Sequence, residues 1–222
     1  PGGLGEGFMS LKNTKGNSVF DIKLSIEKDL NAHKTLTWRS FYRQFKKIGK
    51  AIPKEYYLAY QEKDLKKREQ LIESTLEKYP EGKVAKKETR LVELGSKKWP
   101  ANVVDQMITN QLGNIKDWVL IGGPPCQSFS ASGRRAGGAA GRLDQRGNLF
   151  EAYARIIDHL KPKAFVFENV RGIFGTNKGK DWKHILTTFE RLNYKIDYRL
   201  LDHQFWFVHQ LLFYLTLDLF LL

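Results

Sequence analysis

A short apolar run in the middle of the chain ends abruptly at two glycines, two prolines and a cysteine, within the segment Val119–Ser130. This pattern predicts a buried strand that stops at a tight loop. The consecutive prolines fix φ and lower the conformational entropy of that loop. Because open α/β sheets bind ligands at the carboxyl ends of their strands, we expect the loop to present Cys126, the only cysteine of the chain, at a binding edge.

Two interpretations of Cys126 follow from the residues alone. A single cysteine is most often a small buried hydrophobe. It becomes a nucleophile only as a thiolate, which backbone N–H groups of the loop or the nearby Arg134 and Arg135 could favour. The flanking prolines and the polar residues after Cys126 favour the nucleophile, because a core strand has no use for them.

The composition points to a polyanionic partner. The chain has 222 residues, with 37 Lys and Arg against 24 Asp and Glu and a formal net charge of +13. This excess favours nucleic acid, with a merely soluble basic surface as the alternative. A single cysteine excludes an intramolecular disulfide and is typical of a reducing cytoplasm, and no Cys/His cluster has the spacing of a zinc site.

Helical and extended patterns alternate along the chain. Apolar periodicity predicts helices over 101–116, 148–159 and 181–192, and strands over 19–27, 164–167 and 194–201. A strand, a helix and a second strand that returns in parallel form a Rossmann-like crossover. The sequence therefore predicts an α/β fold in which Glu168 lies beside Cys126 at one edge of a sheet.

Three blocks of the sequence occur together in one known family. They are the glycine-rich Pro1–Phe8, the segment Pro125–Ser130 with its Pro-Cys-Gln, and Ala164–Val170 with its Glu-Asn-Val. In these blocks and their order the chain resembles the DNA cytosine-5 methyltransferases. The resemblance covers residues 1–33 and 117–201.

The resemblance implies an incomplete Rossmann-like methyltransferase sheet, S-adenosylmethionine as cofactor, no metal, and roles for individual residues. The implied catalytic residues are Cys126 and Glu168. The implied cofactor-binding residues are Gly2, Gly3, Leu4, Glu27 and Pro125. The implied residues that contact substrate or DNA are Gln127, Ser128, Ser130, Arg134, Arg135, Asn169 and Val170. Without the resemblance, the first glycines would be a flexible terminus, Glu27 a solvated charge and Glu168 a structural carboxylate.

The implied reaction is methylation of carbon 5 of a cytosine flipped out of double-stranded DNA. Cys126 would attack carbon 6 while Glu168, kept protonated by a dry pocket, supplies a proton to ring nitrogen 3. The setting implied is a bacterial restriction–modification system, with a monomer acting on DNA in the cytoplasm, at the nucleoid. Methylation of RNA cytosine is a further alternative.

The resemblance divides the chain into four segments. These are the start of the catalytic domain (1–33), a lysine-rich helical insertion (34–100), the catalytic core (101–203) and an aberrant apolar tail (204–222). The insertion separates Glu27 from the cysteine loop by more than the family pattern does, and its basic helices either lie along a phosphate backbone or form a solvated face. The adenine-contacting position of the family falls within residues 91–105 and is not assigned to one residue.

Both ends of the chain depart from the family pattern. The strand that precedes the glycine loop, the paired arginines expected after Arg199 and the target-recognition region are all absent. We interpret residues 205–222 as the product of a disrupted reading frame or as a degenerate terminus rather than as a membrane span, since they contain His209, Gln210 and Asp218. An inactive remnant that at most binds nucleic acid, and a basic binding protein with a structural cysteine, are the alternatives to an active enzyme.

Overall fold

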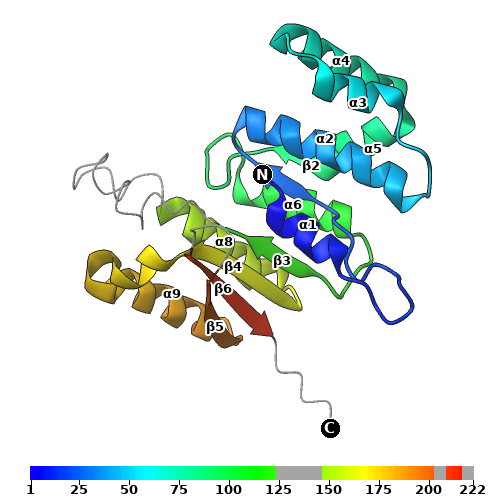
Figure 1. Ribbon diagram of the computed structural model, residues 1–222. Helices are drawn as coiled ribbons and strands as arrows, with labels where there is room; N and C mark the ends of the chain where they lie inside the picture. The colour runs from blue at the N-terminus through cyan, green and yellow to red at the C-terminus, as the bar shows by residue number, and fades with distance from the viewer. Residues whose placement is uncertain (124–146, 203–208, 217–222) are drawn as a thin grey trace. The chain divides into compact units, whose positions relative to one another are not determined.

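The structure is a computed structural model, which describes residues 1–123, 147–202 and 209–216 (Figure 1). The chain divides into two units. Unit 1 consists of Pro1–Trp99 with Met107–Gln111, and unit 2 of Pro100–Gln106 with Leu112–Leu222. Helix α6, Ala101–Leu112, contributes residues to both.

Unit 1 is mostly helical and contains a small parallel sheet. Its elements are α1 (Gly3–Ser10), β1 (Ser25–Glu27), α2 (Leu30–Lys47), α3 (Lys54–Gln61), α4 (Leu65–Lys78), α5 (Pro80–Glu88) and β2 (Thr89–Leu91). Strands β1 and β2 pair in parallel, from Ser25 beside Thr89 to Glu27 beside Leu91. Helix α2 packs against both strands and against α5.

Helix α2 is stabilised by a capping residue at its start, basic residues in its last turn and an apolar face. The side chain of Asp29 accepts a hydrogen bond from the backbone N–H of Ala32, which caps the first turn. Lys46 and Lys47 in the last turn complement the helix dipole.

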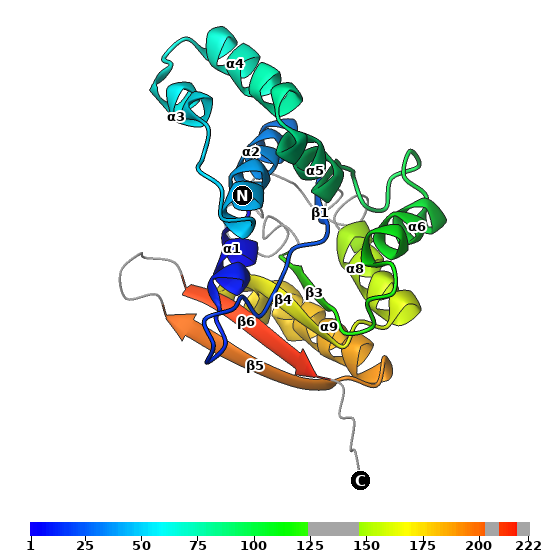
Figure 2. The same cartoon turned by 90° about the vertical axis from the view of Figure 1, so that its right-hand side faces the viewer.

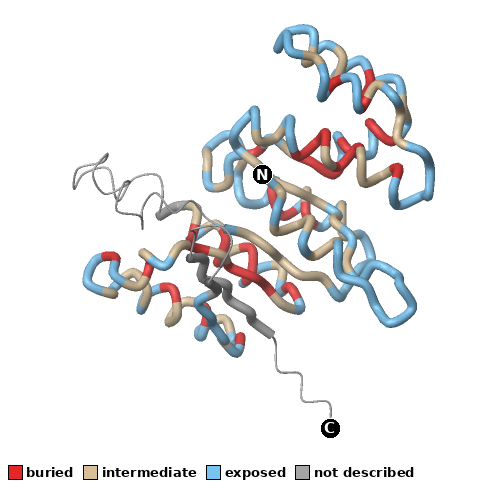
Figure 3. The backbone as a smooth tube through the Cα atoms, in the orientation of Figure 1, coloured by how far each residue is buried: buried red, intermediate tan, exposed pale blue. Residues whose placement is uncertain are grey.

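The buried face of α2 starts an aromatic core that belongs to the helices of unit 1 (red in Figure 3). Trp38 stacks on Phe41 at 5.2 Å and on Tyr56 of α3 at 4.8 Å between ring centroids. Leu76 of α4 and Ala85 of α5 complete this cluster. The region expected to be an insertion thus buries a core of its own, while its boundaries at 34 and 100 remain a prediction.

Unit 2 is an α/β unit with one sheet. Its remaining elements are β3 (Val119–Gly122), α8 (Gly147–Leu160), β4 (Ala164–Val170), the 3₁₀ segment η3 (Arg171–Gly179), α9 (Lys180–Arg191), β5 (Lys195–Asp202) and β6 (His209–Thr216). The strand order is β3-β4-β6-β5 (Figure 2). Strands β3 and β4 are parallel, and β6 runs antiparallel to both of its neighbours.

The core of unit 2 lies between the sheet and helices α8 and α9. Phe165 and Phe167 alternate along β4 and face the helices, and both are fully buried. The ring of Phe165 lies 4.7 Å from that of Phe189 on α9, and Phe150 of α8 packs against the same phenylalanine. The apolar stripe predicted for the helix over 148–159 is therefore buried in this core.

The predicted helices are present as α6, α8 and α9, and the predicted α/β class is confirmed. Helix α6 ends just before Gly113, whose φ of 56° suits a residue that stops a helix. The strand predicted over 19–27 is shorter, because only Ser25–Glu27 has a partner in the three-residue β2.

The tail contains a strand that the sequence did not predict. The backbone of β6 pairs with β4 from Thr216 beside Ala164 to Gln210 beside Val170, and with the whole of β5. The segment therefore fills the place between two strands of the sheet, and its origin in a disrupted frame remains a prediction. Among the described residues, no helix is long and apolar enough to cross a membrane.

Candidate active site at the carboxyl ends of β3 and β4

The carboxyl group of Glu168 lies directly beside the residue that follows β3. The parallel register pairs Gly122 with Phe167, so Gly123 comes level with Glu168. A Cβ atom built on Gly123 would lie 2.5 Å from Oε2 of Glu168, well inside van der Waals contact. Glycine leaves room for the carboxyl at this point, so Glu168 sits where the segment that carries Cys126 begins.

The surroundings of Glu168 favour its neutral form. The side chain is half-buried, and burial raises its pKa above the ordinary value. No group in the described part of the chain donates a hydrogen bond to the carboxyl. A protonated carboxyl in such a place can donate its proton to a bound base.

Tyr153 on α8 braces the ends of the same two strands, a role that the sequence did not indicate. Its buried hydroxyl donates to the backbone oxygen of Val166 in β4 at 2.9 Å and lies 3.4 Å from that of Leu120 in β3. A Cβ atom on Gly122 would lie 2.8 Å from the edge of its ring. Burial raises the pKa of Tyr153 well above its ordinary value, so it remains a neutral donor. The periodicity that predicts the helix over 148–159 gives no sign of this contact, because it depends on how α8 packs on the two strands.

Asn169 and Val170 end the same strand, β4. Asn169 is 2% exposed, and its Oδ1 accepts a hydrogen bond from the backbone N–H of Val170 at 2.9 Å. The side chain of Asn169 thus supports the backbone where β4 passes into η3, and Val170 is half-buried. Contact of either residue with substrate remains a prediction.

The predicted cofactor residues Gly2, Gly3 and Leu4 lie at the amino end of α1. Gly2 has a φ of 84°, a left-handed conformation that favours glycine, and precedes the first helical residue, Gly3. Gly2 has no side chain with which to cap the helix, so within the described part of the chain its first N–H groups can serve an anionic or polar ligand.

Glu27 ends β1 with a carboxylate that the backbone orients. Its Oε1 accepts hydrogen bonds from the N–H groups of Lys28 at 2.8 Å and Asp29 at 2.9 Å. Its backbone oxygen accepts a hydrogen bond from Val92 just beyond β2, at 2.8 Å. The carboxylate therefore has one anchored oxygen and a second oxygen, Oε2, that can accept from a ligand.

The remaining predicted site residues lie outside the described part of the chain. They are Pro125, Cys126, Gln127, Ser128, Ser130, Arg134 and Arg135. Among the residues that are described, no three His, Cys, Asp or Glu side chains gather as a metal ion would require.

Comparison with known proteins gives one family. Residues 96–211 match the family model of the C-5 cytosine-specific DNA methylases. The chain is 33% identical over 209 residues to the type II methyltransferase M.Bpa9945I of Bacillus paralicheniformis, an alignment that covers 88% of this chain and 44% of the relative. It is 39% identical over 98 residues to the type II methyltransferase M1.HphI of Haemophilus parahaemolyticus, covering 44% of this chain and 26% of the relative.

Among solved structures, the chain is similar to the Entamoeba histolytica methyltransferase EhMeth. The TM-score is 0.52 at 15% identity, and the match covers 97% of this chain and 51% of that one. At this identity the likeness concerns the fold alone. The chain spans less than half the length of the curated relatives named above.

Proposed function

Because the chain belongs to the C-5 cytosine-specific DNA methylase family, we propose that the protein methylates carbon 5 of cytosine in DNA through a covalent adduct with Cys126. The observation that carries the proposal is the position of the Glu168 carboxyl beside Gly123. Cys126 follows Gly123 by three positions, and three residues of chain span at most about 11 Å. A thiol so tethered can reach the same six-membered ring as the carboxyl.

Glu168 and Cys126 each carry out one step in the activation of the cytosine ring. The protonated carboxyl of Glu168 gives its proton to ring nitrogen 3, which makes carbon 6 electrophilic. The thiolate of Cys126 then forms a bond to carbon 6, and the electron pair of the carbon 5–carbon 6 double bond makes carbon 5 nucleophilic. After carbon 5 is methylated and loses its proton to a base, the Cys126 sulfur leaves and the proton on nitrogen 3 returns to Glu168.

S-adenosylmethionine, when bound, supplies the methyl group. Two features of unit 1 fit such a ligand. The uncapped amino end of α1, at Gly2, Gly3 and Leu4, offers N–H groups to a polar or anionic group. The second oxygen of Glu27 can accept hydrogen bonds from ribose hydroxyls, while the first is anchored to the backbone.

We propose duplex DNA as the substrate and a restriction–modification system as the setting. The type II names of the relatives support both, and the net charge of +13 supports a nucleic-acid substrate. The target base has to leave the stack to reach a side chain at a sheet edge, which costs a few kcal/mol of unstacking. Arg134 and Arg135 are proposed to contact the phosphate backbone or the flipped base.

A methyl-transfer assay tests this function. The protein is incubated with S-adenosylmethionine that carries a labelled methyl group and with duplex DNA or RNA of the same sequence. We expect label at carbon 5 of cytosine in DNA and none with the variant Cys126→Ser. Label in RNA alone would contradict the DNA assignment. No label with either substrate, together with intact DNA binding, would support the inactive remnant.

A further inference from the structure

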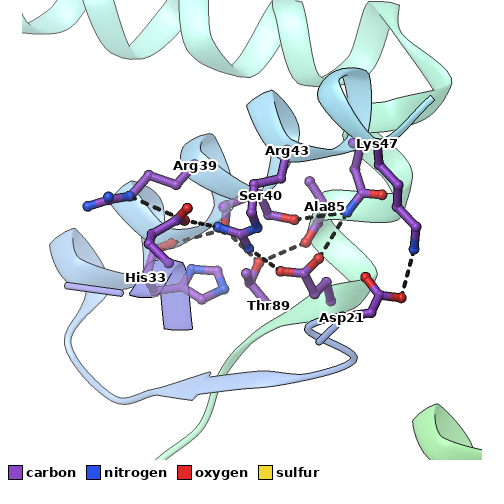
Figure 4. A network of polar contacts seen from close by, with 12 residues as sticks. Asp21, His33, Arg39, Ser40, Arg43, Lys47, Ala85 and Thr89 are labelled. Carbon is purple, nitrogen blue, oxygen red and sulfur yellow. Dashed lines mark hydrogen bonds and ion pairs between the residues drawn. The ribbon is translucent and has the colours of Figure 1, made fainter. Parts of the chain in front are cut away.

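One face of α2 carries three cationic side chains at intervals of four residues: Arg39, Arg43 and Lys47. Residues at this spacing lie on the same side of a helix. Lys47 forms an ion pair with Asp21 at 2.7 Å (Figure 4). Arg39 and Arg43 both form ion pairs with Glu6 of α1. This face therefore meets the amino-terminal segment of the chain at several points.

The first turn of α1 rests on α2. A Cβ atom built on Gly2 would lie 2.8 Å from Cδ2 of Leu36, so the backbone of Gly2 lies close to that side chain. Nη1 of Arg39 donates a hydrogen bond to the backbone oxygen of Pro1 at 3.2 Å. Leu36 and Arg39 of α2 thus contact Pro1 and Gly2, the two residues that precede α1.

Arg43 is the central residue of this contact. Its guanidinium donates through Nη1 to Glu6 on α1 and through Nη2 to Glu88 at the end of α5. The Arg43 side chain is 10% exposed and that of Glu88 is 6% exposed. A planar guanidinium with fixed donors can hold two carboxylates in a defined arrangement, which a lysine does less well.

Glu88, the α5 partner of Arg43, is held by a further hydrogen bond. Glu88 accepts a second hydrogen bond through Oε2, from Nε2 of Gln44, at 2.9 Å. Within unit 1, α2 and α5 are packed together around the aromatic core. Arg43 therefore ties the short helix α1 to a rigid pair of helices.

We propose that Arg43 is a positioning residue for the methyl donor: by bridging Glu6 and Glu88 it fixes the amino end of α1, which takes S-adenosylmethionine. The inference rests on the cofactor role proposed above for Gly2, Gly3 and Leu4. It implies that the segment expected to be an insertion has a direct part in the cofactor site, because α2 and α5 determine where α1 begins.

The test separates cofactor placement from general stability. Affinity for S-adenosylmethionine is measured by calorimetry, and KM and kcat by methyl transfer, for the wild type, Arg43→Gln and Arg43→Lys. Thermal unfolding is followed in parallel. We expect Arg43→Gln to raise Kd and KM for the cofactor by about tenfold, with kcat close to the wild type at saturating cofactor. Arg43→Lys should recover part of the affinity.

Two further variants keep the result interpretable. Lys34→Gln is the matched control, because it removes an exposed ion pair with Glu69 from the same helix without reaching α1, and its KM should not change. Glu6→Gln removes the α1 carboxylate that Arg43 shares with Arg39 and leaves the Arg43–Glu88 pair, so it should raise KM even if Arg43→Gln fails to fold.

Each alternative outcome contradicts a different statement. Variants at Arg43 and Glu6 that lower the unfolding temperature or kcat while KM and Kd stay at wild-type values would overturn the inference and leave the proposed function in place. Wild-type protein that binds no S-adenosylmethionine would overturn the proposed function, and the inference with it.

Discussion

Gly123 lies against the carboxyl group of Glu168 in the candidate active site. The glycine was predicted from the sequence as part of a tight loop, whereas the structure gives it a more specific reason, namely room for a carboxyl oxygen. The contact could not be predicted from the sequence, because it depends on the register of two strands that are more than forty residues apart. Burial of Glu168 likewise follows from tertiary packing. Its place near a strand end was predicted, although β4 continues past the predicted end at Phe167 to Val170.

We expect Gly123→Ala to impair catalysis more than folding. The new methyl group would displace Oε2 of Glu168, which is the end of a flexible side chain and can move without disturbing the sheet. A misplaced proton donor should lower kcat/KM by about 10² in the methyl-transfer assay. Gly175→Ala is the control, since a Cβ atom there meets nothing within 4 Å. Wild-type activity in Gly123→Ala would show that the carboxyl position does not matter.

Glu168→Gln should make the protein less active but more stable at neutral pH. Burial raises the pKa of Glu168, so the folded state binds its proton more tightly than the unfolded chain does. The wild type therefore loses stability as the pH rises through that pKa, and the glutamine variant does not. The difference in unfolding temperature should vanish below about pH 4 and reach its full size once the pH is above the raised pKa. Exposed Glu190→Gln is the control, and a variant less stable than the wild type at pH 8 would refute the argument.

At the level of helices and strands, elements with a strong local period were predictable and those defined by distant partners were not. Helix α8 shows its apolar stripe in the sequence, and its buried residues follow that stripe. Strand β6 lies in an apolar run whose period does not distinguish a strand from a membrane span. The bridge from Arg43 to Glu6 and Glu88 joins residues 37 and 45 positions apart, and no local pattern reveals it.

The contacts of Asp105 on α6 with two residues of α8 should make the stability of unit 2 sensitive to acid. Arg155 donates two hydrogen bonds of 2.7 Å to the carboxylate of Asp105, and Nδ1 of His159 lies 2.6 Å from it. The hydrogen bonds from Arg155 lower the pKa of Asp105, so their contribution is present at neutral pH and is lost as the pH falls through the lowered pKa.

Asp105→Asn should therefore lower the free energy of unfolding at pH 7 by about 2 kcal/mol, and by less as the pH falls below about 4. Denaturant titrations at several pH values measure this difference. Asp158→Asn removes an exposed pair between α8 and Lys161, which follows the end of that helix, and should have no measurable effect. Equal losses in the two variants would contradict a specific role for the Asp105 cluster.

At the scale of the molecule, the predicted residues fall into both units. Gly2, Gly3 and Glu27 belong to unit 1, and Glu168 belongs to unit 2. The family and the α/β fold were predictable because three short motifs carry both. The core that the charged helices of unit 1 build was not predictable, because charge patterns alone do not distinguish a solvated face from a packed scaffold. The central claim is that Cys126 and Glu168 act on one cytosine.

Mass spectrometry of the intact protein after incubation with S-adenosylmethionine and duplex DNA containing 5-fluorocytosine tests that claim most directly. Fluorine at carbon 5 cannot leave as a proton does, so the thiol adduct should persist. We predict a covalent protein–DNA species in the wild type, a far slower yield in Glu168→Gln and none in Cys126→Ser. An adduct that survives in Cys126→Ser, or one that forms at the wild-type rate in Glu168→Gln, would contradict the account.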